Sequence, residues 1–104
     1  MSVLLEFAMF PTDKGESVSE YVGRILKAID ASGLPYQLTP MGTIVEADDL
    51  AGVLALVEEA YRQLEPDCNR VYSSLKLDIR KGTGGRIKRK VQSVEEKVGK
   101  KLGT

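Results

Sequence analysis

The chain has 104 residues, 42% of them hydrophobic, and its 15 basic and 15 acidic residues give a net charge of zero. This length predicts one domain, residues 1–104, with a core small enough for self-association to add useful buried surface. The sequence has no histidine, one cysteine (Cys68), no long apolar run and no signal-like start. It therefore predicts a cytoplasmic protein that is not an enzyme, with no catalytic residue, metal, cofactor, disulfide or membrane partner.

The first two elements are expected to be a central strand and a helix. Residues 2–10 alternate weakly, which predicts a strand with both faces partly covered. One face carries Val3, Leu5, Phe7 and Met9, and the other carries Leu4, Glu6, Ala8 and Phe10. A stripe of apolar residues then predicts a helix over about 17–32. Ser17 and Glu20 have the spacing of a capping box at its start, and Gly33 is the expected end.

The segment 36–46 is the most informative part of the chain. Two strands, 36–40 and 43–47, flank the turn Pro40-Met41-Gly42. Pro40 donates no ladder hydrogen bond, and Gly42 permits a backbone conformation that other residues avoid. The second strand then places a carboxylate, Glu46, among apolar residues. A tight connection followed by a charge inside a strand suggests a binding site more than a packing solution.

The second half of the chain repeats the order helix then strand. Asp48 or Asp49 is expected to cap a helix over about 50–64. Residues 70–80 alternate and predict another strand. One face of this strand carries Val71, Ser73, Leu75, Leu77 and Ile79, and the other carries Tyr72, Ser74, Lys76, Asp78 and Arg80.

This order predicts an α+β, ferredoxin-like βαββαβ fold. Its four-stranded antiparallel sheet has the order 4-1-3-2, and two helices cover one face. The other face is open and is expected to carry Tyr72, Ser74, Lys76, Asp78, Glu6 and Glu46. A further helix, about 86–102, has a narrow apolar stripe of Ile87, Val91, Val94, Val98 and Leu102.

Charge is divided unevenly between this last helix and the rest. Residues 1–78 carry 6 basic and 13 acidic residues, whereas residues 79–104 carry 9 basic and 2 acidic ones. The stripe and the charge together favour a helix that docks on the acidic body of its own or a neighbouring subunit. The Gly-rich loop from Gly82 to Gly85 is interpreted as a hinge, with an anion at the helix N-terminus as the alternative.

Five ordered segments resemble the small thiamine-binding protein family, over nearly the whole chain. They are Phe7-Ala8-Met9-Phe10-Pro11; Ser32-Gly33-Leu34-Pro35-Tyr36; Pro40-Met41-Gly42-Thr43 with Glu46; Arg70-Val71 leading to Lys76-Leu77-Asp78-Ile79-Arg80; and Lys90-Val91-Gln92-Ser93-Val94-Glu95-Glu96-Lys97. The resemblance implies a ferredoxin-like, non-enzymatic binder of thiamine or its aminopyrimidine part. It also implies dimers formed by sheet-edge pairing, which stack through their open sheet faces into a homotetramer with ligand near the subunit interfaces.

Such a ligand needs an acceptor for its exocyclic amine, apolar or aromatic walls, and no metal or nucleophile. Thr43 and Glu46 are the first candidates, next to a turn at Met41 and Gly42 whose amides are expected to be available. A solvated strand-end charge is the alternative for Glu46. Candidate wall residues are Met9, Phe10, Tyr36 and Met41, with Phe7 expected mainly in the core.

Glu6, Lys76 and Asp78 are also candidate ligand contacts. Because Glu6 and Lys76 belong to neighbouring strands, an ion-pair network within a sheet-on-sheet interface is the alternative interpretation. Two other functions stay open. One is a regulatory or structural protein that binds another protein through the open sheet face. The other, less favoured, is a nucleic-acid-binding module, which is opposed by the pI of 6.3 and by Tyr72 as the sole aromatic residue of its strand.

Overall fold

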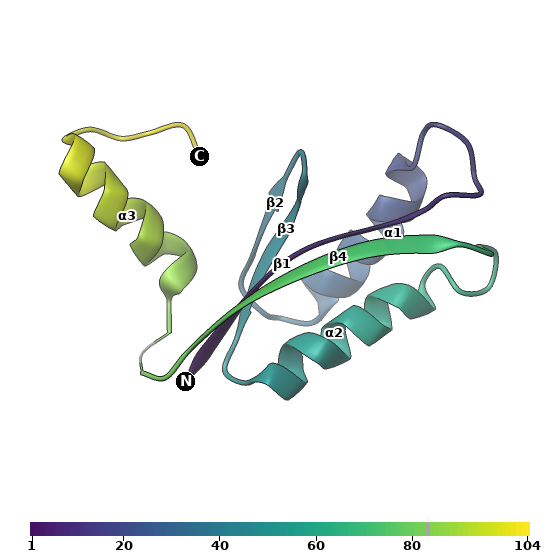
Figure 1. Ribbon diagram of the computed structural model, residues 1–104, viewed down its shortest axis with the longest axis horizontal. Coiled ribbons are helices and arrows are strands. Elements are labelled where there is room, and N and C mark those ends of the chain that lie inside the picture. The colour runs from purple at the N-terminus through teal and green to yellow at the C-terminus, as the bar shows by residue number, and fades with distance from the viewer. Residues whose placement is uncertain (83) are drawn as a thin grey trace.

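The computed structural model describes residues 1–82 and 84–104, and over these residues it contains four strands and three helices. In chain order they are β1 (Ser2–Pro11), α1 (Ser19–Ala31), β2 (Tyr36–Thr39), β3 (Gly42–Ala47), α2 (Leu50–Arg62), β4 (Val71–Arg80) and α3 (Arg86–Val98) (Figure 1). The antiparallel sheet has the order β2-β3-β1-β4, which is 4-1-3-2 read from the other edge. The predicted α+β, βαββαβ fold with an added helix is therefore confirmed.

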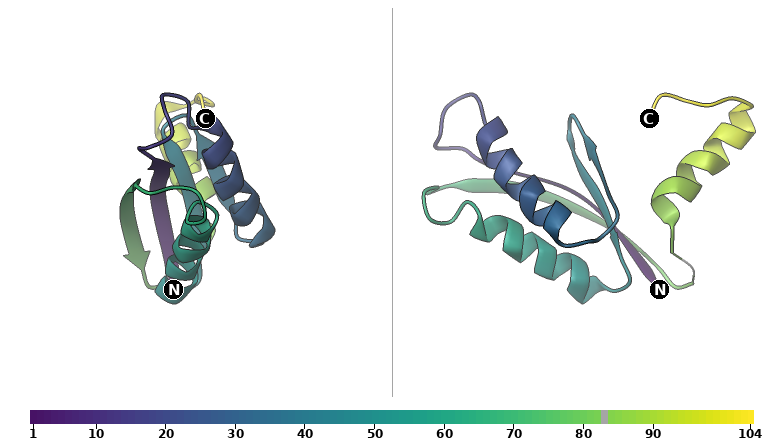
Figure 2. Two further views of the ribbon diagram at one scale, coloured as in Figure 1. Left: turned by 90° about the vertical axis from the view of Figure 1, so that its right-hand side faces the viewer. Right: turned by 180° about the vertical axis from the view of Figure 1, so that it is seen from behind.

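Strand register decides which residues share a face of the sheet. β1 pairs with β4 over its whole length and with β3 over its first half, and directly paired residues point to the same side. In this register Leu5 lies between Val45 and Leu77, whereas Glu6, on the opposite side, is paired with Lys76. Helices α1 and α2 lie together on the Leu5 side (Figure 2). The other side is called the open face below, and all six residues expected there lie on it.

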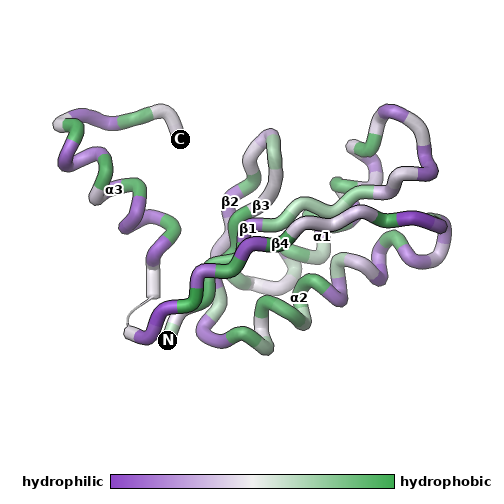
Figure 3. The backbone as a smooth tube through the Cα atoms, viewed as in Figure 1, coloured by the Kyte–Doolittle hydropathy of each residue, from purple (hydrophilic) through white to green (hydrophobic). Residues whose placement is uncertain are grey.

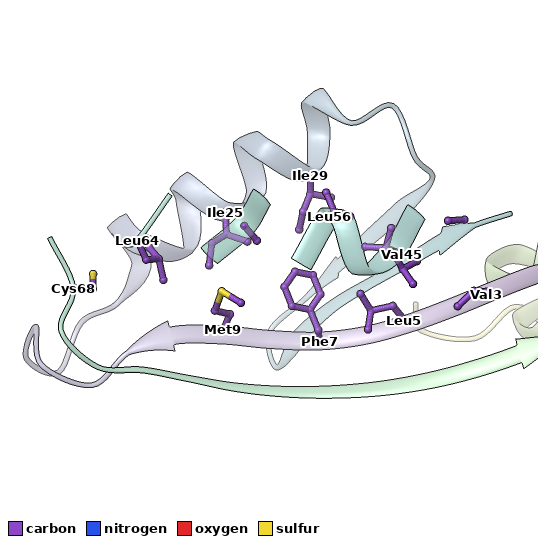
Figure 4. Packing of buried hydrophobic residues seen from close by; sticks show 13 residues of the cluster. Val3, Leu5, Phe7, Met9, Ile25, Ile29, Val45, Leu56, Leu64 and Cys68 are labelled. Atoms are coloured by element: carbon purple, nitrogen blue, oxygen red, sulfur yellow. The ribbon is translucent and has the colours of Figure 1, made fainter. Parts of the chain in front are cut away.

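The hydrophobic core lies between β1, β3 and the two covering helices (Figure 4). Val3, Leu5, Phe7 and Met9, the expected inner face of the first strand, are all buried, and Phe7 is only 3% exposed. Each such side chain contributes about 1.5–3 kcal/mol when fully buried. The alternation of β1 was therefore sufficient to predict its inner face.

The starts of the two covering helices differ from each other in how they are capped. Asp49 caps α2, because its carboxylate accepts a hydrogen bond from the Gly52 amide at 2.7 Å. The capping box predicted for α1 is wrong: the N-cap residue is Val18, and no side chain caps this end. Glu20 instead pairs with Arg24 one turn later at 3.3 Å, so its carboxylate is engaged elsewhere.

Gly42 is required for a different reason from the one expected. Its φ is not positive, so its backbone is open to other residues. A Cβ at this position would lie 3.0 Å from the carbonyl oxygen of Phe7 on the neighbouring strand. Close approach of β1 and β3 beside the hairpin, and not an unusual backbone angle, therefore disfavours a side chain here.

Helix α3 stands apart from the layer formed by α1 and α2, at the far end of the sheet (Figures 1 and 2). It ends at Val98 and not at residue 102, because Gly99 adopts a φ of 87°. Along its backbone, strongly hydrophilic and hydrophobic residues alternate (Figure 3). Val94 and Val98 of its apolar stripe are 52% and 54% exposed, so the stripe is only partly covered within the chain. None of the three helices in the described part of the chain has the length and apolarity needed to cross a membrane.

Candidate functional site

A cavity of about 270 Å³ lies between α1 and the sheet, beside the β2–β3 hairpin. The second half of β1, the first two turns of α1 and the hairpin all contribute to its wall. Five of the ten residues predicted for the ligand site border this cavity: Met9, Phe10, Met41, Gly42 and Thr43. The tertiary structure therefore brings half of the predicted site together in one place.

The cavity has an apolar wall with one available hydroxyl. Thr43 is 4% exposed, and its hydroxyl has no hydrogen-bond partner among the described residues. Thr39 also borders the cavity, but its Oγ1 donates to the Gly42 carbonyl at 2.8 Å and accepts from the Met41 amide at 3.3 Å. Thr39 thus holds the turn, and the Thr43 hydroxyl stays available at the cavity. No charged side chain borders this cavity within the described residues.

The wall residues differ in how freely they can contact a ligand. Met9 is 7% exposed and belongs to the core, whereas Met41 is 89% exposed at the rim. Phe10 borders the cavity, but its ring packs against Tyr72, with ring centroids 5.9 Å apart. Met9 is therefore a buried wall residue, and Met41 is an exposed residue at the rim. Phe10 borders the cavity and also contacts Tyr72 of the open face.

Glu46 lies away from this cavity, on the open face, and its carboxylate is already bound within the chain. Its Oε1 accepts from the amides of Arg86 at 2.9 Å and Ile87 at 3.4 Å, and its Oε2 accepts from the Ser2 hydroxyl at 2.6 Å. Burial alone would raise the pKa of Glu46, but these hydrogen bonds outweigh it and hold the pKa below its ordinary value. Glu46 therefore caps α3 as an ionised carboxylate.

This capping also settles how the N-terminus of α3 is satisfied. The amides that an external anion would have used are bound to Glu46. Thr83 belongs to the loop considered as an anion site, and it lies outside the described residues. The hinge interpretation of the loop agrees with the positive φ of Gly82 and Gly85, 120° and 74°.

Tyr36 and Glu46 share a second groove, of about 470 Å³, between the β2–β3 side of the sheet and the start of α3. The Tyr36 hydroxyl donates to Asp30 at 2.8 Å, and this hydrogen bond raises the pKa of the phenol. The ring is 39% exposed. This groove is distinct from the cavity at Thr43, so Tyr36 and Thr43 do not contact one bound ring together.

Glu6, Lys76 and Asp78 lie on the open face and form ion pairs within the chain, while the sheet-on-sheet interface of the alternative interpretation stays a prediction. Lys76 lies 3.6 Å from Glu6 across the strand pair, and both are exposed. Asp78 bonds to Arg86 at 3.0 Å and also to Lys90. The Lys90 and Arg86 hydrogen bonds hold the pKa of the Asp78 carboxyl below its ordinary value. Their contact with a ligand stays a prediction.

Two features of the site were missed by the sequence reasoning. Val18 and Val22 of α1 border the Thr43 cavity, although no residue of this helix was among the candidate wall residues. Arg86 is 3% exposed, and no local pattern marks it as buried. A simpler signal was available for Thr43 and Glu46: three positions apart in one strand, they must point to opposite faces.

Comparison with known proteins gives a consistent result. Residues 5–95 match the family described as thiamine-binding protein. The chain is 37% identical over 95 residues to the UPF0045 protein Mb1933 of Mycobacterium bovis, covering 91% of this chain and 93% of that one. It is also similar to the crystal structure of hypothetical protein MJ1052 from Methanocaldococcus jannaschii, with 36% identity and a TM-score of 0.82 over 91% and 97% of the two chains.

A third similarity concerns the fold alone. A putative thiamine biosynthesis/salvage protein of Thermotoga maritima has a TM-score of 0.76 and 23% identity, over 90% of this chain and 99% of that one. In the described part of the present chain, no group of three or more Cys, Asp or Glu side chains is arranged to hold a metal ion.

Proposed function

The chain belongs to the thiamine-binding protein family, and on this premise we propose that it is a non-enzymatic binding protein for thiamine or its aminopyrimidine part. The ring is held in the cavity between α1 and the β2–β3 hairpin. The observation that carries this assignment is the Thr43 hydroxyl, which faces an apolar cavity and has no hydrogen-bond partner among the described residues. A hydroxyl both donates and accepts, so it can bind the amine or a ring nitrogen of a ligand that enters the cavity.

The composition of the wall favours one half of thiamine inside the cavity. The aminopyrimidine is neutral and flat, whereas the thiazolium carries a positive charge. Burying a cation without a counter-charge is unfavourable, and no carboxylate borders the cavity within the described residues. The pyrimidine is therefore the buried half, and the thiazolium extends past Met41 at the rim. The cavity volume of about 270 Å³ suits such a ring.

Assembly into a homotetramer is the second part of the proposal. β4 lies at the sheet edge and is ten residues long, and Leu75, Leu77 and Ile79 on its helix side are 40%, 43% and 48% exposed. A long edge strand with exposed apolar residues favours pairing with another strand. Pairing of two β4 strands gives a dimer, and two dimers stack through their open faces, where Tyr72 is 60% exposed.

The experiment is isothermal titration of the full chain with thiamine, its phosphates and the hydroxymethyl-pyrimidine half, with light scattering on the same sample. We expect saturable binding without turnover, and weaker binding by Thr43→Val, which keeps the shape of the side chain but removes its hydroxyl. Thr12→Val, in the exposed loop after β1, is the matched control. Absence of binding by every ligand would overturn the function, whereas wild-type affinity in Thr43→Val would overturn only the choice of cavity.

One observation supports a second candidate, a protein that binds another protein through the open face. The Phe10–Tyr72 ring pair lies there, with Tyr72 exposed, and aromatic residues are enriched in protein interfaces. A stable monomer in light scattering, together with no heat from any thiamine compound, would favour this candidate over the first.

A further inference from the structure

A third groove, next to α3 and separate from the groove at Tyr36, has a composition that the proposed function does not use. It has a volume of about 440 Å³ and is bordered by the cationic side chains of Arg80, Lys81, Arg86, Arg89 and Lys90 and by Ser93. We propose that this groove binds the phosphate or pyrophosphate group of a small molecule. The proposal does not depend on the pyrimidine cavity.

The charge balance of the groove is strongly one-sided. Five cationic side chains border it, and no carboxylate does within the described residues. Asp78, the nearby acid, is engaged with Arg86 and Lys90. Arg80 and Lys81 are exposed and have no ion-pair partner in the described part of the chain. The groove therefore holds positive charge that the chain itself does not neutralise.

The position of these cations opposes the stability of α3. Arg86, Arg89 and Lys90 lie in its first turns, at the end of the helix that carries partial positive charge. Acidic residues are the favoured type at that end, and α3 has none in its first turn. Glu46 from β3 and Asp78 from β4 supply two negative charges, against the positive charges of these three residues and of the neighbouring Lys88. The start of α3 therefore breaks the rule that favours acidic residues at a helix N-terminus. Such departures from local rules are typical of functional sites.

One wall of the groove is fixed in place before any ligand arrives. The Arg86 guanidinium donates to Ser2 Oγ at 3.0 Å, to the Ser2 carbonyl at 2.9 Å and to the Asp78 carbonyl at 2.6 Å. It is thus a buried, oriented charge, while Arg80 and Lys81 reach the groove from the end of β4. The Ser93 hydroxyl adds a neutral donor one turn further along α3.

Several separated donors suit an anion with several oxygens. Guanidinium and ammonium groups form their strongest hydrogen bonds with phosphate and carboxylate oxygens. The cations come from the end of β4 and from the first two turns of α3. They are therefore spread over a wider area than a ligand with a single point charge would contact. We therefore expect pyrophosphate to bind more tightly than phosphate.

This groove is far from the pyrimidine cavity. Arg80 is paired with Ser2 at one end of β1, whereas the cavity begins at Phe7. Phe7 lies five positions after Ser2 along the extended strand, a span of about 17 Å. A single small ligand does not fill both places, so the two sites can be tested separately.

The test is titration of the full chain with inorganic pyrophosphate and with inorganic phosphate at low salt. The double variant Arg80→Gln, Lys81→Gln removes two groove charges outside the buried network. The control Lys97→Gln, Lys100→Gln makes the same change in net charge at exposed positions elsewhere on the α3 segment. We expect pyrophosphate to bind the wild type and the control equally, and the groove variant about tenfold or more weakly.

Three results would overturn the proposal. They are no saturable binding of either anion, an equal loss of affinity in both double variants, and tight binding of single-stranded RNA with a steep salt dependence but no binding of pyrophosphate. Far-ultraviolet circular dichroism of each variant checks that α3 is still formed. A phosphate ester such as thiamine phosphate, compared with pyrophosphate, then shows whether the anion is recognised free or as part of a larger ligand.

Discussion

Glu46 of β3 caps α3 by accepting a hydrogen bond from the Arg86 amide at 2.9 Å, across 40 positions of sequence. The same carboxylate accepts from the Ser2 hydroxyl at the start of β1. Arg86 in turn returns to Ser2 with its guanidinium. One buried acid and one buried base thus fasten α3 to the sheet, and the exposed remainder of the helix depends on this attachment for its position.

Removing the carboxylate should release α3 from the sheet. We expect Glu46→Ala to cost about 1–3 kcal/mol at this attachment, because the buried amide of Arg86 and hydroxyl of Ser2 lose their acceptor. Hydrogen exchange at the first turn of α3 measures the effect, which is expected to be local and not global. Glu46→Gln keeps one acceptor oxygen and should be intermediate.

The matched control for this change is Glu96→Ala. Glu96 is exposed on α3 itself and has no hydrogen-bond partner among the described residues. Glu96→Ala should leave hydrogen exchange in the first turn of α3 unchanged. Equal protection of α3 in Glu46→Ala and in the wild type would contradict the role assigned to the carboxylate.

Acid should weaken the same attachment. The pKa values of Glu46 and Asp78 lie below their ordinary values of 4.5 and 3.8 in the folded state. The unfolded chain therefore binds protons first as the pH falls, so these groups stabilise the fold above about 4.5 and stop doing so as the pH passes through the lowered values. The protection of the Arg86 amide, measured by nuclear magnetic resonance as its exchange rate relative to that of an unfolded peptide at the same pH, should fall in this range.

The pH measurement needs a local readout, since other acids behave similarly. Asp13 and Asp67 also have lowered pKa values, through hydrogen bonds from the Asn69 amide and from Arg24. Global unfolding therefore combines several groups. In Glu46→Gln, the protection of the α3 amides from hydrogen exchange should depend less on pH. An unchanged pH profile would assign the loss of protection in acid to Asp78 or to another acid.

A charge on the exposed edge of β4 should disrupt the proposed sheet-edge dimer. Leu77→Lys places an ammonium on the helix side of the edge strand, where Leu77 is 43% exposed, so the monomer fold should tolerate it. We expect the mass in light scattering to fall from tetramer to dimer, because face stacking stays possible. Leu54→Lys, on α2 at 46% exposure, is the control and should keep the wild-type mass. Unchanged mass in both variants would place the interface elsewhere.

Gly42→Ala should destabilise the fold at the border of the Thr43 cavity. The new methyl group would lie 3.0 Å from the Phe7 carbonyl oxygen, and backbone on a central strand cannot move away easily. We expect a loss of about 1–3 kcal/mol in denaturant-induced unfolding. Gly23→Ala, in α1 with open space around it, should instead stabilise by about 0.5–1 kcal/mol. Equal stability of the two variants would show that β1 and β3 do not approach closely.

Much of the fold could be predicted because its signals are local. The alternation of residues 2–10 and 70–80, the stripes of the helices and the punctuating Gly and Pro residues were enough for element order and strand faces. The Glu6–Lys76 pair followed from the strand order alone. The capping box at Ser17 failed because α1 begins at Ser19 with Val18 as its N-cap residue, so Ser17 and Glu20 do not occupy the N-cap and N3 positions that the box requires.

The site was predicted only in part, because its members were chosen by residue type along the chain. Alternation with a period of two already places Thr43 and Glu46 on opposite faces of β3. The cavity at Thr43 is completed by residues of α1. The use of Glu46 could not be read from the strand that carries it, since its partners are Ser2 and Arg86 at the two ends of the chain.

The sequence by itself determined the family, the element order and which side chains of each strand share a face, since these depend on local periodicity and on residue identity. Only the tertiary structure decided that Glu46 is a helix cap, that Thr43 lies at an apolar cavity, and that the cations of β4 and α3 converge on one groove. Those outcomes depend on how distant segments pack together, and no spacing within a single segment encodes that packing.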